Sequence, residues 1–381
     1  MQYLFLGKNM KNPFKYGELT QDAAFCNRQA ELKRIHQAFK DAQNLILISP
    51  RRWGKSSLID VAVARYKGKQ MVVKMDCFGI TSEEQFIETY LKAVLKASNT
   101  KLQDFINTAK KFISSVIPYL SFSIGDQDEV RIALHLSGNP IDLDAVLDLP
   151  QKIANERGIR MIVCMDEFQK VYEWPTGKSL LEKLRSCWQR HHDVGYCLYG
   201  SKRHLMTTIF SDSSQPFYKF GETLFLNKIE RPEWVLFLID QFKSSGKVIP
   251  EELAGTIVDR TTRHSYYVQY YARLCWSESD KTIQLQHLES AWLNLLNDHL
   301  PVFRQTADGL TAYQVNYIKA FCAGEKHFSS QRVMRDYNLG SPGNIKRIET
   351  TLEDQEIMNF FPDQHEFAEP YFEPLFRKYF L

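Results

Sequence analysis

One segment near the N-terminus restricts the fold more than any other part of the chain. A short apolar run, residues 44–48, leads directly into Ser49-Pro50-Arg51-Arg52-Trp53-Gly54-Lys55-Ser56-Ser57-Leu58. Uninterrupted apolar runs of this length are typical of strands that are buried on both faces of a parallel sheet. Apart from its first position, the segment after the run matches G-x-x-x-x-G-K-[ST], the phosphate-loop pattern. It therefore predicts a strand, a phosphate-binding loop and a helix, in that order.

The residue types in this loop suit a nucleoside triphosphate. Gly54 lets the backbone approach phosphate so that successive N–H groups point inward, and the helix that follows directs its positive end at the anion. Lys55 is expected to lie in a surface loop and to reach the β- and γ-phosphates, and Ser56 is expected to ligate Mg²⁺. Residues 49–57 are thus the predicted nucleotide-binding residues. The alternative is a plain helix cap, and Ser49 departs from the pattern's glycine.

A second Gly-Lys-Ser triplet lacks this setting. Gly177-Lys178-Ser179 follows Trp174-Pro175-Thr176 rather than an apolar run, and Tyr172 stands where the first glycine of the pattern belongs. We interpret this copy as an ordinary helix start.

Two adjacent carboxylates supply the second half of the predicted site. Asp166 and Glu167 follow five apolar residues, 161–165, and so stand at the carboxyl end of a strand, where open α/β sheets bind ligands. Asp166 is expected to hold Mg²⁺ through Ser56 or water, and Glu167 to orient and polarise the attacking water. The alternative is a strand that ends in a solvated acidic turn.

The next strand ends in a small polar residue. Ser201 follows Tyr199-Gly200, and its strand tip is expected between those of the other two motifs, where it could sense the γ-phosphate. We therefore predict Ser201, with Lys55 and Glu167, as a catalytic residue. Lys202 or Arg203 could reach phosphate or a neighbouring subunit, with a solvated basic turn as the alternative.

The overall pattern predicts an α/β domain followed by helices. Strand-like runs alternate with helix-period segments such as 82–98 and 179–190, which indicates a parallel sheet flanked by helices. Residues 120–136 predict an inserted hairpin, and strand signals vanish after about residue 230. The predicted strands are residues 44–48, 71–75, 161–165, 196–199 and 223–226, and the predicted domains are residues 1–230, 231–303 and 304–381.

The last of these domains has the outline of a winged helix-turn-helix. It shows helices at 311–322 and 329–337, a third opening at the Ser341 cap with Pro342, and two wing strands at 357–361 and 365–368. Residues 301–381 hold nine Lys and Arg against eleven Asp and Glu. Because DNA-reading domains usually carry a basic face, both DNA docking and packing against a protein remain open.

Composition argues against several classes of protein. Lys and Arg number 48 against 45 Asp and Glu, so any nucleic-acid contact must come from a local patch. No segment reaches the roughly 18 apolar residues that cross a bilayer. Seven scattered cysteines without a C-x-x-C pair argue against a disulfide framework and a structural zinc site, and favour the cytoplasm. The pair His191-His192 is expected at a solvated helix end rather than at a metal.

Further segments resemble a known family. Asn12-Pro13-Phe14 with residues 25–32 is similar to an F-x-G-R-x-x-E-L segment beside the nucleotide base. Other matching segments are Pro50-Arg51-Arg52, Met75-Asp76-Cys77, the sensor-like turn 200–204, the lid-like segment 262–269 and the closing segment 367–372. Arg263 and Ser265 replace the lid's Gly and Pro, and Tyr218-Lys219-Phe220 lacks the arginine of the family's Y-G-R. The chain resembles prokaryotic AAA+-type P-loop ATPases of the STAND-related, archaeal-ATPase kind.

The resemblance implies ATP and Mg²⁺ as ligands. It also implies that residues 231–303 form a helical lid and that residues 304–381 form the winged-helix domain. The expected function is a Mg-dependent ATPase that acts as a nucleotide-driven conformational switch, with ATP and ADP, a protein or DNA as partners, no membrane contact and oligomerisation open. The alternative is a nucleotide-gated scaffold or DNA-docking protein with negligible turnover.

Overall fold

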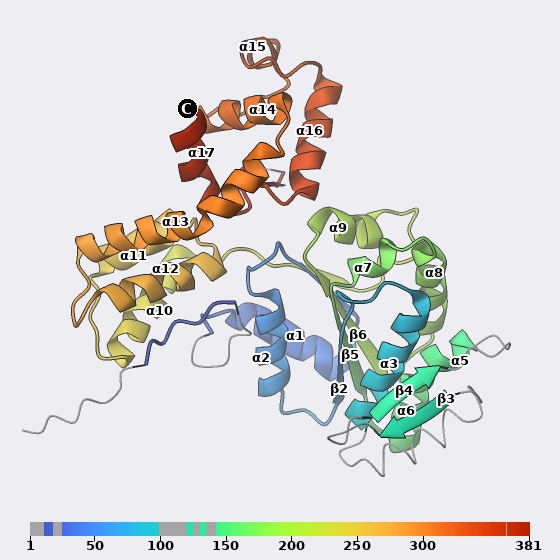
Figure 1. Cartoon of the computed structure of the whole chain (residues 1–381). Coiled ribbons are helices and arrows are strands. Elements are labelled where there is room, and N and C mark those ends of the chain that lie inside the picture. Colours follow the sequence, from blue (N-terminus) through green and yellow to red (C-terminus); the bar gives the residue numbers. More distant parts are fainter. Residues whose placement is uncertain (1–10, 18–24, 99–119, 125–129, 135–141, 363) are drawn as a thin grey trace, which may run out of the picture. The chain divides into compact units, whose positions relative to one another are not determined.

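The chain divides at two points, after Asn27 and after Asn227. The structure, a computed structural model, describes residues 11–17, 25–98, 120–124, 130–134, 142–362 and 364–381 (Figure 1). Arg28–Asn227 form a unit that we call the sheet unit. The described residues before Arg28 group instead with Lys228–Leu381, and together they form the helical unit. This grouping differs from the predicted first domain, 1–230, in the place of the N-terminal segment.

Five parallel strands form the centre of the sheet unit, in the order β2-β5-β6-β1-β7. They are β1 (Leu45–Ile48), β2 (Met71–Asp76), β5 (Met161–Asp166), β6 (Val194–Gly200) and β7 (Glu222–Phe225). All five predicted strands are confirmed. Every residue of β1 and β6 is buried, as expected for strands covered on both faces. Because β6 lies between β1 and β5, its end lies between the ends of the strands that carry the two predicted motifs.

Helices cover both faces of this sheet (Figure 1). On one side lie α1 (Gln29–Asp41) and α2 (Lys55–Arg65). The remaining helices of the sheet unit pack their apolar side chains into a single cluster with side chains of the strands. These helices are α3 (Glu83–Ser98), α5 (Leu143–Leu147), α6 (Leu149–Arg157), α7 (Gln169–Tyr172), α8 (Gly177–Trp188) and α9 (Arg203–Ser211).

The second Gly-Lys-Ser triplet lies at the start of α8, as predicted. A Cβ atom on Gly177 would lie 2.1 Å from the backbone oxygen of Val171. Glycine is therefore needed here for close packing against the preceding turn, which is a structural reason and not a phosphate-binding one.

A hairpin interrupts the alternation of strands and helices in the sheet unit. Strand β3 (Leu120–Ile124) pairs antiparallel with β4 (Val130–Leu134) and forms a separate two-stranded sheet. The predicted hairpin is thus confirmed for these residues, while 125–129 and 135–136 lie outside the described ones.

The helical unit begins with four helices and holds the N-terminal segment. Asn12 donates its side-chain amide to the Arg273 carbonyl at 3.1 Å, and the Lys15 backbone N–H donates to Gln269 Oε1 at 3.2 Å. Phe14 is fully buried and packs on Phe242 at a ring distance of 4.8 Å. These contacts explain why the segment groups with helices so distant in sequence. The four are α10 (Arg231–Ser244), α11 (Glu251–Arg260), α12 (Ser265–Glu278) and α13 (Leu285–Asp308).

The C-terminal elements follow the predicted order up to β9, and a further helix, α17, that was not predicted comes after them. They are α14 (Ala312–Cys322), α15 (Gln331–Asp336), α16 (Pro342–Asp354), the antiparallel strands β8 (Met358–Phe360) and β9 (His365–Phe367), and α17 (Phe372–Phe380). Ser341 caps α16 by accepting a hydrogen bond from the Asn344 N–H at 3.3 Å, as its sequence predicted. The border predicted between 303 and 304 falls inside α13, so one continuous helix crosses it.

All seven cysteines are buried, and none of them forms a disulfide bond with another.

Among the described helices, none combines the length and the apolar character required to cross a membrane.

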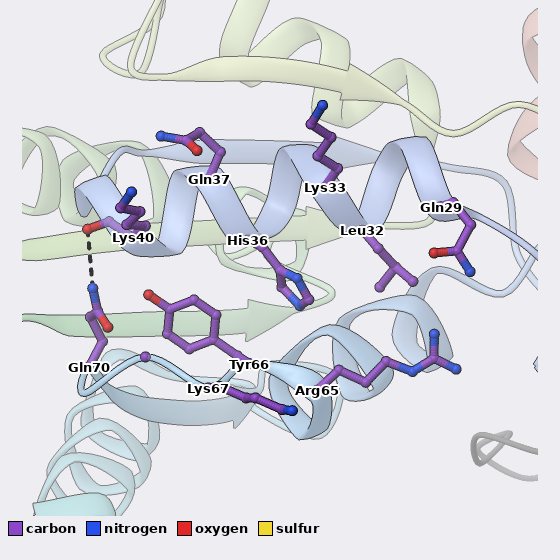
Figure 2. Close-up of a pocket in the computed structure, with 11 residues that line it drawn as sticks. Gln29, Leu32, Lys33, His36, Gln37, Lys40, Arg65, Tyr66, Lys67 and Gln70 are labelled. Carbon is purple, nitrogen blue, oxygen red and sulfur yellow. Dashed lines mark hydrogen bonds between the residues drawn. The ribbon is translucent and has the colours of Figure 1, made fainter.

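A basic hollow of about 680 Å³ lies between α1 and the residues that follow α2 (Figure 2). Among the described residues, no carboxylate lines it. Four cationic side chains do: Lys33, Lys40, Arg65 and Lys67. The ring of Tyr66 lies between α1 and the turn that follows α2. The hollow is at the C-terminal end of α2 and contains none of the residues predicted for nucleotide binding, so it is not the predicted nucleotide site.

Candidate functional site

The loop between β1 and α2 has the backbone geometry that its glycine predicts. Gly54 has φ 94°, in the left-handed region that side chains with a Cβ avoid, and α2 begins at the next residue. Arg52 also has a positive φ, 60°. The Ser49 side chain is buried and donates to the Pro50 carbonyl at 3.0 Å, so it turns back on its own loop.

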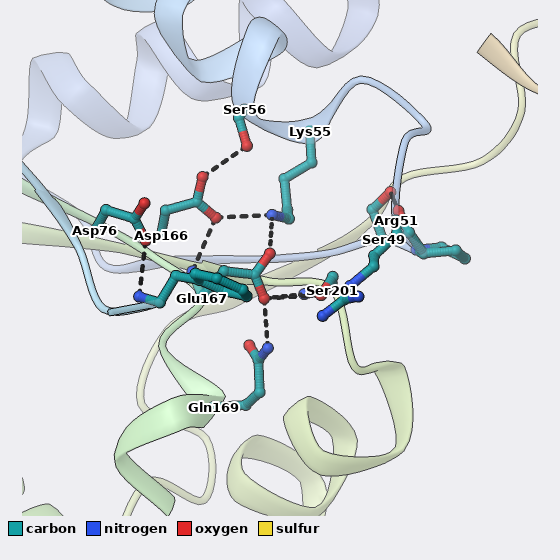
Figure 3. A network of polar contacts seen from close by, with 11 residues as sticks. Ser49, Arg51, Lys55, Ser56, Asp76, Asp166, Glu167, Gln169 and Ser201 are labelled. Carbon is teal, nitrogen blue, oxygen red and sulfur yellow. Dashed lines mark hydrogen bonds and ion pairs between the residues drawn. The ribbon is translucent and has the colours of Figure 1, made fainter. Parts of the chain in front are cut away.

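Lys55 is the first residue of α2 and is 6% exposed. Its Nζ lies 2.7 Å from Asp166 Oδ1 and 2.8 Å from Glu167 Oε1 (Figure 3). The expectation that Lys55 lies in a surface loop is therefore wrong. The loop folds over the end of the sheet, and the ammonium group meets both carboxylates at the tip of β5.

A direct hydrogen bond joins the two predicted metal residues, Asp166 and Ser56. The second carboxylate oxygen of Asp166, Oδ2, accepts this hydrogen bond of 2.6 Å from the Ser56 hydroxyl. The parallel register pairs Asp166 with Asp76, the last residue of β2, whose carboxylate accepts the Phe78 N–H at 2.9 Å. Hydroxyl and carboxylate oxygens are the donors that Mg²⁺ prefers, so Ser56 and Asp166 fit that ion chemically.

Glu167 lies where β5 has ended, with φ 50°. A left-handed glutamate is costly, and such strain occurs where surrounding contacts hold a residue in place. Those contacts converge on Oε2, which accepts hydrogen bonds from the Ser201 hydroxyl at 2.7 Å and from the Gln169 side-chain amide. Asp166 and Glu167 therefore share Lys55 but differ in their other partners.

The pKa of Glu167 is lowered from its ordinary value. Burial acts to raise this pKa, but the charge of Lys55 and hydrogen bonds from Lys55, Gln169 and Ser201 stabilise the ionised form more strongly. The carboxylate is consequently ionised at neutral pH and can accept a proton or orient a water molecule.

Ser201 lies at the tip of β6 and is 7% exposed. Its hydroxyl contacts Glu167, and Arg51 Nε of the phosphate loop lies 3.5 Å from the same hydroxyl oxygen. The structure thus brings together residues from the ends of β1, β5 and β6. Lys202 instead pairs with Glu173 at 2.6 Å.

Two buried residues lie outside both sequence motifs: Gln169, which belongs to this network, and Arg28, which contacts the loop before α2. Gln169 is fully buried and donates to Glu167, and a Cβ on Gly200 would lie 1.9 Å from Gln169 Oε1, so Gly200 makes room for it. Arg28, 6% exposed, donates to the carbonyls of Asn227 at 2.6 Å and Trp53 at 3.4 Å. Arg28 belongs to a segment singled out by resemblance, whereas no local pattern marks Gln169.

The expectation for His191 is wrong. Its side chain is 2% exposed rather than solvated, and its Nε2 lies 3.1 Å from Asp148 Oδ1 and 3.6 Å from Cys187 Sγ. Cys187 stands four residues earlier on α8, at a spacing that the sequence search passed over. His192, the other member of the pair, is exposed.

Two solved structures resemble almost the whole chain. The Walker-type ATPase PABY2304 of Pyrococcus abyssi matches with a TM-score of 0.68 at 17% identity, over 94% of this chain and 97% of that one. The ORC2 protein of Aeropyrum pernix, solved as ADPNP–ADP complexes, matches with a TM-score of 0.55 at 13% identity, over 96% of each chain. No protein-family model matches the sequence, and no curated protein matches it.

These likenesses agree with the architecture seen in the chain itself. Strand β1 leads through the loop into α2, and β6 separates β1 from β5, the strand that ends in the acidic residues. The chain has the fold of a P-loop NTPase, in which a five-stranded parallel sheet is flanked by helices and followed by a helical C-terminal part.

Proposed function

We propose that the protein binds ATP with Mg²⁺ and hydrolyses it, and that the bound nucleotide sets its conformational state. One observation carries the proposal: a single connected polar network lies at the ends of these elements (Figure 3). Its members are Lys55 and Ser56 at the start of α2, Asp166 and Glu167 at and just after the end of β5, and Ser201 just after β6. Phosphoryl transfer needs a cation at the phosphates and a group that positions the attacking water, and a lysine and a carboxylate at the strand ends can supply them.

Each residue of the network has a separate role in this proposal. Ser56 and Asp166 hold Mg²⁺, which when bound neutralises charge on the phosphates. Lys55 binds the β- and γ-phosphates, and residues 49–57 provide backbone N–H groups and side chains around them. Glu167, ionised and fixed by Ser201, orients the attacking water and accepts its proton.

The pairing of Lys55 suggests how nucleotide acts as a switch. Lys55 neutralises both carboxylates, at 2.7 and 2.8 Å. Phosphate would compete for the same ammonium group, so ATP binding would loosen Lys55 from Asp166 and Glu167. Ser56 and Asp166 would hold Mg²⁺, which would supply positive charge beside the carboxylates. The network therefore rearranges when ATP binds and again when the γ-phosphate leaves. Because all seven cysteines are free, we place this activity in a reducing compartment, the cytoplasm.

The direct test measures nucleotide binding and phosphate release by the full chain, with Mg²⁺ and with EDTA. The proposal expects Mg-dependent ATP binding and catalytic phosphate release that EDTA stops. Mg-dependent binding without turnover would favour the nucleotide-gated scaffold instead.

Replacing Ser201 by alanine should slow turnover about 10- to 100-fold, since a hydrogen bond to a charged group contributes about 1.5–3 kcal/mol. The same change removes one of the bonds that lower the pKa of Glu167, so that pKa rises. Less of the carboxylate is then ionised in mild acid, and the acid limb of the pH–rate profile should move to higher pH. Ser201→Thr, which keeps the hydroxyl, should restore both rate and profile. An unshifted acid limb in Ser201→Ala would remove Ser201 from this role.

DNA docking is a second candidate function, favoured by α16. Lys346 and Arg347 are exposed there and form no ion pair within the part of the chain that the structure describes. By contrast, the Arg332 guanidinium on α15 pairs with Glu325 at 2.6 Å, and Arg335 contacts Asp336 at 3.2 Å. Unpaired cations on one helix are those that can neutralise phosphates.

Replacing Lys346 and Arg347 together by alanine should weaken DNA binding and flatten its salt dependence, by about one unit of slope for each phosphate that the variant no longer neutralises. The measurement is duplex affinity across a salt series. The matched control is the Arg332→Ala, Arg335→Ala pair on α15, whose side chains are already paired and should matter less. If the parent binds no DNA at low salt, α16 is left as a surface for a protein partner.

A further inference from the structure

A second buried cluster of chemically reactive side chains lies away from the phosphate loop. Asp148 connects α5 to α6, Cys187 lies in the last turn of α8, and His191 follows that helix. Cys187 Sγ is 2.7 Å from Asp148 Oδ1, His191 Nε2 is 3.1 Å from the same oxygen, and Sγ and Nε2 are 3.6 Å apart. Three possible ligand atoms of different chemistry thus lie within 4.8 Å of one another.

The surroundings of His191 hold its ring in one orientation. Its second nitrogen, Nδ1, lies 2.8 Å from the hydroxyl of Tyr196, a fully buried residue of β6. Histidines that ligate metals typically use their other ring nitrogen in such a bond, which fixes the tautomer and aims the ligating nitrogen. When Nδ1–H donates to the Tyr196 hydroxyl, Nε2 is the nitrogen left to bind a cation beside Asp148 and Cys187.

We propose that Asp148, Cys187 and His191 bind a divalent zinc-like cation, with water in the remaining coordination position. Sulfur, imidazole nitrogen and carboxylate oxygen are the ligands of zinc in proteins, and three protein ligands with one open position is an established zinc arrangement. Asp148 is 32% exposed, so an ion can enter from its side. This site is independent of the proposed ATPase activity.

Cys187 and Arg190 both affect how an ion would bind at this site. The Cys187 thiol donates to Asp148, and binding of an ion there would release the thiol proton to solvent. The Arg190 guanidinium lies 3.8 Å from Asp148 and is 54% exposed, so it can rotate into water when a cation arrives. Once bound, the ion would connect the α5–α6 junction to the end of α8, directly before β6.

The test titrates the chelator-stripped full chain with Co²⁺, a spectroscopic substitute for zinc. We expect one equivalent to bind with a thiolate-to-cobalt charge-transfer absorption, and Zn²⁺ to displace it. Cys187→Ser should abolish this absorption, and His191→Ala should weaken binding at least tenfold. Two controls should keep it: Cys322→Ser, which removes another buried cysteine, and Asp166→Asn, which alters the proposed Mg²⁺ site.

Absence of the thiolate absorption in the parent, or its survival in Cys187→Ser, would overturn the zinc site. If Cys187→Ser fails to fold, alkylation of the parent protein still tests the site. Zn²⁺ should then slow the alkylation of Cys187 severalfold, as mapped by mass spectrometry, without slowing that of Cys322. Equal alkylation rates with and without Zn²⁺ would also overturn the proposal.

Discussion

Replacing Lys55 by alanine should lower the affinity for ATP about 30-fold or more, because loss of one buried partner of a charge pair costs about 2–5 kcal/mol. The lysine is proposed as the charge that meets the β- and γ-phosphates, and the loop around it provides mostly neutral donors. Isothermal titration with Mg-ATP measures the loss. Lys178→Ala is the matched control, because Lys178 follows a glycine in the second Gly-Lys-Ser triplet but is exposed on α8.

The structure adds an effect on stability. Without Lys55, the carboxylates of Asp166 and Glu167 face each other with their shared cation removed, so the variant should unfold at a lower temperature than the parent. Circular dichroism must therefore accompany the titration. A folded Lys55→Ala protein that binds ATP as tightly as the parent would show that this loop is not the nucleotide site.

Replacing Glu167 by glutamine should leave ATP affinity within a few fold of the parent while turnover falls by a factor on the order of 10²–10⁴, the usual contribution of a positioned general base. Glutamine keeps the size of the side chain and an oxygen that can accept from Ser201. It removes the charge that polarises the water, an interaction that matters most in the transition state. Phosphate release at saturating Mg-ATP, with binding confirmed separately, measures the effect.

Two further variants delimit this result. Asp166→Asn should weaken Mg-dependent binding and turnover together, since Asp166 is proposed to hold the metal. Glu173→Gln should change neither, because Glu173 pairs with Lys170 and Lys202 rather than with the network. Equal turnover in the parent and in Glu167→Gln would remove Glu167 from the mechanism and favour the scaffold alternative.

The sequence by itself determined the strands and the phosphate loop, because both are local. Strands buried on both faces must be continuously apolar, so residues 44–48 and 161–165 could be recognised without knowing their neighbours. The turn before α2 needs a left-handed residue, which marks Gly54. The second Gly-Lys-Ser triplet could be recognised as an ordinary helix start, because no apolar strand precedes it. Caps are equally local, as Ser341 shows at the start of α16.

Only the tertiary structure decided which side chains meet. The contact between Ser201 and Glu167 depends on β6 lying beside β5, and the burial of Lys55 depends on how the loop folds over β5. Asp148 lies 43 residues from His191 in the sequence, so no spacing rule connects them. Periodicity shows which face of an element is buried, but not what covers it. Those partners follow from strand order and helix packing, which are set by the whole core rather than by any one segment.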